Sequence, residues 1–553
     1  MDSFGVELAK VTLMLAKKLA LDDAHETIDP KQGELSFHDD ALPLDNLDQN
    51  VIQADALFTK WPTVDAVVGN PPYQSKNKRQ SELEAGYQGK LRKHFPEVDG
   101  RADYCAYWFH KAQDILQPGK RAGLVGTNTI RQNYSREASL DHIVNTGGTI
   151  TEAVSTLVWP GDAVVHVSIV NWIKGDAPGP KRLFSQTGDK RGAEERVYTM
   201  EFIGPSLSLG ENVTIALPIT ANKKALCFQG QTHGHKAFLI KAPEAKSKLW
   251  LDKSGKLSNV LHPYLIATDF IARKDPKPRR YVIDFQGLSL LEAEDFPDLF
   301  KLIQKNVLPS RQAAAKKESE RNDRTLDENS DAHVNVHHAN FLKQWWQLSY
   351  AREDMIEAIS KLSRYIACGR VTRRPIFVFL SREIHPNDAL QVFAYEDDYT
   401  FGVLQSDVHW QWFMARCSTL KADPRYTSNT VWDSFPWPQE PCVESVRAVA
   451  DAAVALRTTR NELAKKHHRS LRELYRALEL PGKSALKDAQ AELDKAVRSA
   501  YGIGEQTDIL KFLLSLNLEI SSSEKSGKSV RSAGLPEYIF DRSSYITGDS
   551  LKD

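Results

Sequence analysis

The residues best suited to chemistry follow a short apolar run near the start of the chain. Val64 to Val68 predicts a buried strand, which Gly69 and the segment Asn70-Pro71-Pro72-Tyr73 end abruptly. The side-chain amide of Asn70 and the neighbouring backbone carbonyl can both accept hydrogen bonds from one exocyclic amino group. The ring of Tyr73 can stack on the base that carries this group. Because Pro71 fixes φ, the acceptors are held in place before a substrate arrives.

The position of this segment favours a base as its ligand. In an α/β sheet the ligand crevice lies at the carboxyl ends of the strands, which is where Asn70 is expected. A paired base cannot reach such a pocket, so a base in a duplex would have to flip out of the stack. The alternative interpretation of the same four residues is a rigid turn without a chemical role.

Three basic segments could contact DNA, because Lys and Arg neutralise backbone phosphates. A solvated loop is the alternative for the second and third segments. Their basic residues are Lys76, Lys78 and Arg79, then Arg273, Arg279 and Arg280 in "RKDPKPRR", and finally Arg370, Arg373 and Arg374 in "GRVTRR". The histidines His333, His337 and His338 have metal-like spacing but lie in a polar Asn- and Asp-rich stretch, so we predict no metal site.

Composition limits the class of protein. The 553 residues are 41% hydrophobic and 26% charged, which is ordinary for a folded chain of several domains. Lys plus Arg and Asp plus Glu both number 72, so local basic patches rather than a global field must hold any nucleic acid. The five cysteines form no CxxC pair, which argues against disulfides and a zinc site and favours a reducing cytoplasm. No segment resembles a signal peptide or a transmembrane helix, so no membrane partner is expected.

The first 180 residues alternate between helical and strand patterns. Strands separated by helices predict an α/β layer with a mostly parallel sheet. The helical patterns cover Phe4 to Leu19, expected to be buried, and Ala102 to Leu116. The strand patterns cover Asn50 to Ala54, Val64 to Val68, Arg121 to Gly126 and Val164 to Ile173.

The rest of the chain divides into three further regions. Residues 181–440 contain short β-rich runs, interrupted by the polar stretch Ser310 to Asn340, and predict a separate α+β domain. These runs are "YVIDF", "PIFVFL", "LQVFAY" and "YTFGVL". From Val443 the pattern is helical, with a second helix over Ser484 to Tyr501. We therefore expect domains at 1–180 and 181–440, a helical region at 441–520 and a tail at 521–553.

The order of the motifs resembles that of the adenine-N6 DNA methyltransferases. Asn70 to Tyr73 resembles their motif IV, and the segments that resemble motifs III, V, VI and VIII are "NVIQADALF", "RADYCAYWF", "GLVGTNTI" and "VHVSIVNWI". The resemblance implies a Rossmann-like sheet and S-adenosyl-L-methionine as methyl donor. It also implies that Asn70 and the Pro71 carbonyl bind the adenine amino group and that Tyr73 stacks on the flipped base. Asp55 would lie at the adenine side of the cofactor pocket.

Segments beyond the catalytic fold resemble the MmeI-like type IIG/IIL restriction-modification enzymes. The likeness extends from about residue 2 to 520 and implies a target-recognition domain over 181–440. It also implies double-stranded DNA as the partner and a role in restriction-modification or phage defence. The segments are "YVIDF", "LSRYIACGRVTRRPIFVFL", "DDYTFGVLQS", "DPRYTSNTVWDSFPWP" and "AQAELDKAVRSAYG".

One part of the family pattern is not found. The cofactor-binding glycine-rich loop should precede motif IV, yet only Gly5, Gly33 and Gly69 do so and none forms a G-x-G. We therefore expect an N-terminally truncated catalytic domain. Either the open reading frame is truncated, or a separate N-terminal methyltransferase or nuclease polypeptide supplies the rest. Three hypotheses remain: an adenine DNA methyltransferase that needs such a piece, a catalytically silent DNA-recognition subunit, and an RNA or protein methyltransferase.

Overall fold

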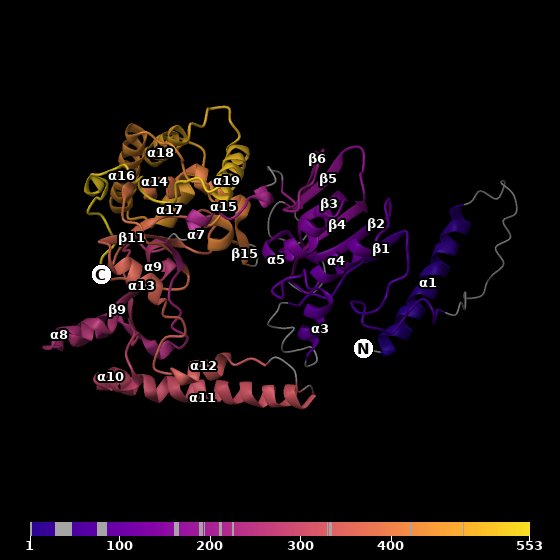
Figure 1. Cartoon of the computed structure of the whole chain (residues 1–553), viewed down its shortest axis with the longest axis horizontal. Helices are drawn as coiled ribbons and strands as arrows, with labels where there is room; N and C mark the ends of the chain where they lie inside the picture. Colours follow the sequence, from indigo (N-terminus) through magenta and orange to yellow (C-terminus); the bar gives the residue numbers. More distant parts are fainter. Residues whose placement is uncertain are drawn as a thin grey trace.

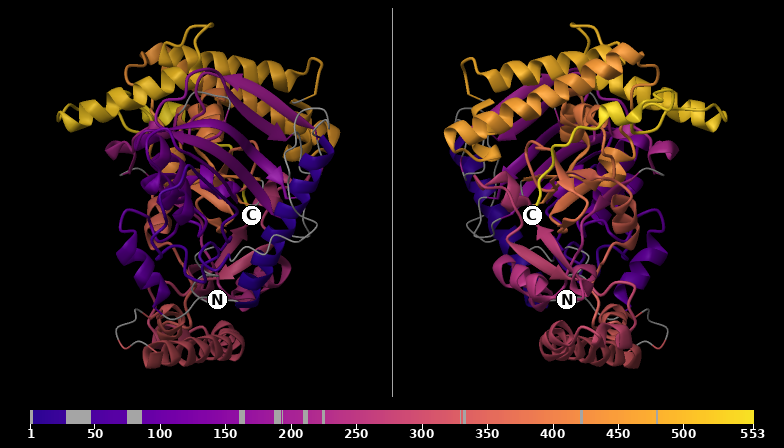
Figure 2. Two further views of the ribbon diagram at one scale, coloured as in Figure 1. Left: turned by 90° about the vertical axis from the view of Figure 1, so that its right-hand side faces the viewer. Right: turned by 90° about the vertical axis from the view of Figure 1, so that its left-hand side faces the viewer.

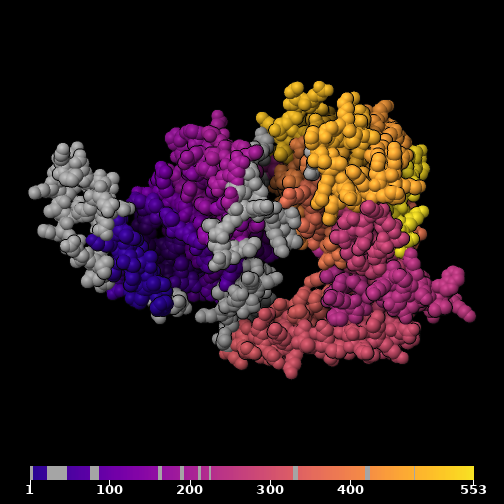
Figure 3. Space-filling model, turned by 180° about the vertical axis from the view of Figure 1, so that it is seen from behind, coloured from indigo at the N-terminus to yellow at the C-terminus, as the bar shows by residue number. Residues whose placement is uncertain are grey.

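The computed structural model describes residues 3–27, 47–74, 86–159, 165–186, 192, 194–208, 213–223, 226–328, 330, 334–420, 423–478 and 480–553. Figure 1 shows two lobes, one built on a large sheet and the other on smaller sheets and the C-terminal helices. The C-terminal helices and the long helix α11 lie at opposite ends of the molecule (Figure 2). From behind, α11 extends along the lower edge of the second lobe toward the first (Figure 3).

The first lobe contains a six-stranded sheet in the order β1-β2-β4-β3-β5-β6. Among these described strands the pairs β1–β2 and β3–β5 are parallel and the other three pairs are antiparallel. The sheet is therefore mixed, and the expected mostly parallel sheet is wrong. It also extends past residue 180. The strands are β1 (Ala66–Gly69), β2 (Arg121–Thr127), β3 (Gly148–Val158), β4 (His166–Lys174), β5 (Lys181–Gln186) and β6 (Glu195–Met200).

Helix α4 covers one face of this sheet. Phe109 on α4 stacks on Trp172 of β4 with ring centroids 5.8 Å apart, and the indole of Trp172 donates to Gln113 Oε1 at 3.0 Å. These apolar contacts form the core of the lobe, together with Leu124 and Val170. The helical segments are α1 (Ser3–Thr27), α3 (Tyr87–His94), α4 (Ala106–Ile115), η1 (Asn128–Arg131), α5 (Asn133–Arg136), η2 (Glu137–Asp141) and α6 (His142–Asn145).

Two predictions for the start of the chain are wrong. Helix α1 forms, but its apolar side chains are exposed rather than buried, and it stands apart from the sheet beside β1 (Figure 1). Residues 50–54 form a turn, in which the amides of Asn50 and Val51 both donate to the Leu47 carbonyl at 2.9 Å. Residues 50–54 therefore do not pair with β1, which is the edge of the sheet within the described residues.

The second lobe holds two four-stranded sheets, ordered β13-β9-β10-β8 and β12-β11-β14-β7, and the short pair β15-β16. The strands are β7 (Cys227–Gln229), β8 (Leu239–Lys241), β9 (Leu261–Leu265), β10 (Arg280–Ile283), β11 (Arg364–Gly369), β12 (Val378–Ser381), β13 (His385–Pro386), β14 (Leu390–Phe393), β15 (Ser418–Leu420) and β16 (Asp423–Arg425). Three of the four predicted β-rich runs therefore contain strands.

The sequence analysis predicted none of the individual helices of this lobe, and two of them are instructive. "YTFGVL" lies in the buried helix α14 (Asp398–Gln405), because the Asp397 carboxylate caps it by accepting from the Thr400 amide at 2.7 Å. Most of the polar stretch after Ser310 lies in α11 (Pro297–Glu328). The other helices are η3 (Val213–Ile215), α7 (Thr220–Lys223), η4 (Lys236–Phe238), α8 (Ala242–Leu251), η5 (Lys256–Asn259), α9 (Ala267–Ile271), α10 (Leu290–Glu294), α12 (His337–Lys343), α13 (Glu353–Ser360), α15 (Asp407–Arg416) and η6 (Ser428–Trp432).

The helical C-terminal region is confirmed. The expected first helix is divided at His468, which has a φ of 49° and ends α16. The segments are α16 (Val443–His467), α17 (Leu471–Leu478), α18 (Ala485–Tyr501), α19 (Ile509–Lys525) and η7 (Arg542–Tyr545). No helix among the described residues is long and apolar enough to cross a membrane.

The end of the described chain returns to the four-stranded sheets of the second lobe. Leu551 bonds to the backbone of β12, donating to the Phe379 carbonyl at 2.9 Å and accepting from the Ser381 amide at 3.0 Å. Asp553 lies 3.0 Å from the Lys246 ammonium on α8 and accepts from the Tyr281 hydroxyl on β10. Residues 547–553 therefore join elements that are separated by some 300 positions in sequence.

Candidate active site

The segment Asn70 to Tyr73 lies at the carboxyl end of β1, where the sequence places it. Asn70 is exposed and Pro71 is buried, so the rigid backbone is anchored while the amide faces outward. The Tyr73 hydroxyl donates to Asn70 Oδ1. The two side chains that could hold a base therefore meet in one small site.

The surroundings of Tyr73 keep its phenol protonated. Its ring packs against the core of the sheet lobe. Burial, the Cys105 thiol and the Asp103 carboxylate raise the pKa of Tyr73 to about 12. A neutral phenol remains a donor at any physiological pH. The contact with Asn70 is therefore insensitive to pH in that range.

Asp103, in the loop before α4, supports the segment and binds the end of β2. Its Oδ2 accepts from the hydroxyls of Thr127 at 2.7 Å and Thr129 at 3.1 Å, and its own amide donates to Ser135 Oγ at 2.8 Å. The next amide, that of Tyr104, donates to the Gln74 carbonyl at 3.1 Å. This network ties the loop after β1 to the loops after β2. Sequence reasoning noted the segments that contain Asp103 and Thr127 but gave these residues no role.

Asp55 is connected to the same loop through two tyrosines. The Tyr87 hydroxyl donates to Asp55 Oδ2 at 2.8 Å and lies 2.5 Å from the Tyr104 hydroxyl. Asp55 Oδ1 accepts from the Leu57 amide at 3.0 Å. The Lys111 ammonium fixes the rest of this turn by donating to the carbonyls of Ala56, Leu57 and Thr59 at 2.6 to 2.9 Å. Tyr87, Tyr104 and Lys111 were missed, because no local pattern shows that they converge.

The donor set allows a partial test of the predicted cofactor. Asp55 is only partly buried, and each carboxylate oxygen can accept a second hydrogen bond, so it can still receive an adenine amino group. The sequence before Asn70 contains no glycine-rich loop whose backbone amides could bind the rest of the cofactor. Asp55 therefore fits the adenine side of the predicted pocket, and no residues that would hold the rest of the cofactor are found among the described residues.

The basic residues of "RKDPKPRR" are engaged with carboxylates. Arg273 and Arg280 both approach the buried Asp269 Oδ1, at 3.5 and 3.6 Å. Arg279 contacts Asp275 Oδ2 at 3.2 Å. Their side chains remain partly exposed, so phosphate contacts would compete with these pairs. Lys76, Lys78 and Arg79 lie outside the described residues.

The arginines of "GRVTRR" differ from one another. Burial lowers the pKa of Arg370 to about 10, so this side chain belongs to the fold. Arg374 lies over the ring of Trp410, 4.8 Å from its centroid. Arg373 is exposed. Of the three, Arg373 is best placed to reach a phosphate.

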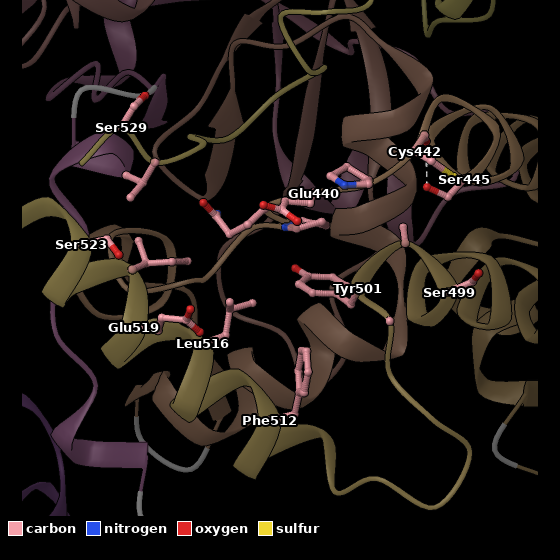
Figure 4. Close-up of a pocket in the computed structure, with 17 residues that line it drawn as sticks. Glu440, Cys442, Ser445, Ser499, Tyr501, Phe512, Leu516, Glu519, Ser523 and Ser529 are labelled. Carbon is pink, nitrogen blue, oxygen red and sulfur yellow. Dashed lines mark hydrogen bonds between the residues drawn. The ribbon is translucent and has the colours of Figure 1, made fainter.

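A cavity of about 580 Å³ lies elsewhere, among the C-terminal helices (Figure 4). It is lined by the segment from Pro438 to Ser445, the end of α18 and one face of α19. Its Tyr501 hydroxyl is used by the fold, donating to the Pro436 carbonyl at 2.9 Å. None of the residues of the candidate site lines it, so size alone does not locate the chemistry.

Comparison with known families identifies both main regions. The model of the MmeI DNA-methyltransferase domain matches residues 1–185, and that of the MmeI target recognition domain matches residues 218–439. The first range contains Asn70 and Asp55, and the second contains all six of the predicted arginines from 273 to 374.

Individual relatives agree with this division. DNA methyltransferase A of Bacillus subtilis (strain 168) is 22% identical over 527 residues, which cover 90% of this chain and 53% of that protein. The type II methyltransferase M.XhoI of Xanthomonas vasicola is 28% identical over 165 residues, which cover 28% of this chain and 27% of that protein. The chain thus spans about half or less of the curated relatives it matches.

The fold also matches a solved structure. The type IIL restriction-modification enzyme MmeI in complex with DNA superposes with a TM-score of 0.66 at 21% identity. The match covers 83% of this chain and 57% of that one. Because two domain models of one family together match most of its length, the chain belongs to the MmeI-like restriction-modification enzymes. It carries their DNA-methyltransferase and target recognition domains.

Proposed function

We propose that the chain is part of a site-specific DNA methyltransferase that transfers a methyl group to the N6 nitrogen of adenine. The observation that carries the proposal is the contact between Asn70 and Tyr73 at the exposed end of β1. It brings an amide oxygen and an aromatic face together where a flipped base can enter. The proposed setting is a restriction-modification or phage-defence system in the cytoplasm.

The residues would act by orienting one amino group. S-adenosyl-L-methionine would supply an electrophilic methyl carbon. Asn70 Oδ1 and the Pro71 carbonyl would each accept a hydrogen bond from the adenine amino group. Tyr73 would give up its hydrogen bond to Asn70 and stack on the base. The adenine nitrogen would thus be oriented to receive the methyl group, and the methylated, positively charged nitrogen would then lose one proton to water.

We also propose that a separate polypeptide covers the exposed edge of the sheet lobe. Val68 of β1 is 84% exposed. A stripe of five apolar side chains on α1 is between 49% and 72% exposed, at a spacing that places them on one helix face: Phe4, Leu8, Val11, Leu15 and Leu19. An apolar stripe beside the open edge of β1, the outermost described strand of the sheet, suits a partner that adds both a strand and a helix. Such a partner would also supply the missing half of the cofactor pocket.

A catalytically silent DNA-recognition subunit is the second candidate function. It is favoured by the absence of a G-x-G before Asn70 in the sequence. In this case the domain matched by the target recognition model would bind double-stranded DNA, and Asn70 would have no chemical role. The two candidates predict different results for the same variant.

The test is Asn70→Ala, with Asn145→Ala as the matched control, because Asn145 is an exposed asparagine of the same lobe. Methyl transfer from labelled donor to duplex DNA is measured with any required partner present, beside DNA affinity. We expect Asn70→Ala to lose transfer by at least about a thousandfold and to keep its affinity, since phosphate contacts dominate binding. Transfer near the wild-type rate in Asn70→Ala contradicts the assigned site. DNA binding without transfer by the unmodified protein supports the silent subunit.

A further inference from the structure

Three potential metal ligands converge on the sheet lobe, away from the Asn70 loop. His110 and Asp114 lie one turn apart on α4, and His142 begins α6. One atom from each of the three side chains lies within 4.8 Å of the other two, the only such cluster among the described residues. No motif in the sequence brings these two segments together.

Hydrogen bonding fixes the ring orientation of His110. Its Nδ1 lies 3.2 Å from the Ala138 carbonyl, an acceptor, so Nδ1 carries the proton in the neutral ring. Nε2 is then an acceptor and faces Asp114 Oδ2 at 3.5 Å. Two acceptors facing each other repel unless a cation lies between them. A histidine that donates one ring nitrogen to a carbonyl and presents the other is also the usual arrangement of a metal ligand.

His142 approaches the same carboxylate from the other side. Its Nε2 lies 2.7 Å from Asp114 Oδ1, and its ring stacks on that of His110 with centroids 3.7 Å apart. Two protonated imidazoles at this distance would repel each other. The His110 side chain is 6% exposed and that of His142 18%, whereas Asp114 is 51% exposed. The cluster is therefore enclosed on its histidine side and open to water at the carboxylate.

We propose that His110, Asp114 and His142 bind a Zn²⁺ ion. Two imidazole nitrogens and one carboxylate oxygen are a donor set that zinc accepts, with water in the fourth position at the open side. Donor atoms bound at about 2.0–2.2 Å around a tetrahedral ion lie about 3.4 Å apart, close to the separation of His110 Nε2 and Asp114 Oδ2. Binding would require the His142 ring to rotate away from its stack on His110, and the hydrogen bond between His142 and Asp114 would be replaced by two bonds to the ion.

The ion would have a structural role. It would join the C-terminal half of α4 to the segment that begins at His142. Helix α4 starts directly after Asp103 and Cys105, so fixing it would also fix the network that supports Tyr73. We therefore expect zinc to raise the stability of the sheet lobe without taking part in methyl transfer.

The test uses the purified chain without an affinity tag, dialysed against chelator and titrated with ZnCl₂. Zinc content, the calorimetric dissociation constant and the melting temperature are measured for wild type, His142→Ala and Asp114→Asn. The double variant His337→Ala/His338→Ala is the control, since these exposed histidines have the metal-like spacing noted in the sequence.

We expect one zinc ion per wild-type chain with a dissociation constant below about 1 µM, and a melting temperature that rises with zinc and falls again with chelator. His142→Ala should bind at least about a hundredfold more weakly and Asp114→Asn at least about tenfold, each with an unchanged circular dichroism spectrum. The control should bind like wild type. The proposal would be overturned if the wild-type chain bound no zinc. It would also be overturned if His142→Ala and Asp114→Asn both bound zinc as tightly as wild type. Loss of zinc in the control would assign the ion to α12 instead.

Discussion

The Asn70 loop and the charged cluster around Asp398 use polar groups in opposite ways. Asn70 is exposed, and its side-chain oxygen accepts a hydrogen bond from the Tyr73 hydroxyl. Asp398 is 2% exposed and receives bonds from Arg364 at 2.9 Å, from Arg457, and from the Thr547 amide at 3.1 Å. The first arrangement leaves hydrogen-bonding capacity for a ligand, and the second leaves little.

This contrast shows why counting arginines does not locate a DNA-binding surface. Arg364 and Arg457 lie within the matched recognition domain and its neighbouring helix, but they are 2% and 1% exposed in side-chain terms. Their charges are neutralised by Asp398 and Asp549. A basic residue can contribute to phosphate binding only where its side chain is exposed, and Arg373 is exposed.

The largest effect should come from breaking the buried cluster. Asp398→Asn leaves two buried guanidinium groups with one carboxylate fewer, and we expect a loss of about 3–5 kcal/mol in the free energy of unfolding. Urea unfolding measures it. Asp275→Asn, whose carboxylate is 60% exposed, is the control and should cost less than about 1 kcal/mol. Equal effects in both variants would remove the contrast.

The next largest effect concerns the exposed side of the comparison. Tyr73→Ala should lower kcat/KM for methylation by about tenfold to a hundredfold, because base stacking contributes about 1–3 kcal/mol. Tyr73→Phe keeps the ring and should stay within about tenfold of wild type. Steady-state kinetics on duplex DNA separate the two. If phenylalanine is as damaging as alanine, the hydroxyl rather than the ring is the important group.

A smaller, pH-dependent effect is expected at Asp494 on α18. Burial and the Asp407 carboxylate raise its pKa to about 6, above the value of about 3.9 in an unfolded chain. The folded state therefore holds this proton more tightly, and the resulting stability is lost as pH rises from about 4 to 6. The stability of Asp494→Asn minus that of wild type should therefore increase by about 2–3 kcal/mol between pH 4 and pH 8. A pH-independent difference in thermal unfolding would contradict this sign.

The smallest effect tests the arginine exposed in the recognition domain. Arg373→Ala should lower the slope of log affinity against log salt by about one unit, because one phosphate contact is lost. Arg374→Ala should change the slope less, since its guanidinium rests on Trp410. Filter binding at several salt concentrations measures both. Equal slopes in wild type and Arg373→Ala would place Arg373 among solvated residues.

Local patterns in the sequence predicted the elements whose signals are local. The strand before Asn70, helix α4 and the C-terminal helices follow from apolar periodicity and a sharp stop. The helix over "YTFGVL" was missed because β-branched and aromatic residues favour strands. Here the Asp397 cap stabilises the helix instead. The helix α11 was missed because its largely polar, exposed sequence has no clear apolar periodicity.

The candidate site was predicted in part for the same reason. Asn70 to Tyr73 is contiguous, so its chemistry is visible in the sequence. The support from Asp103 and Tyr87 depends on contacts across tens of residues, which the composition does not encode. The cluster of His110, Asp114 and His142 was not predicted for a similar reason, since 28 residues separate Asp114 from His142.

The return of residues 547–553 to the recognition sheets has a consequence for the order of folding. Loop closure between Tyr281 and Asp553 spans most of the lobe, and such non-local contacts form late. During synthesis, β10 and β12 leave the ribosome well before Leu551 can pair with β12. Until residues 547–553 have been synthesised, the edge of β12 that pairs with Leu551 remains uncovered. This interval is when a nascent chain of this kind is most exposed to chaperones, proteases and aggregation.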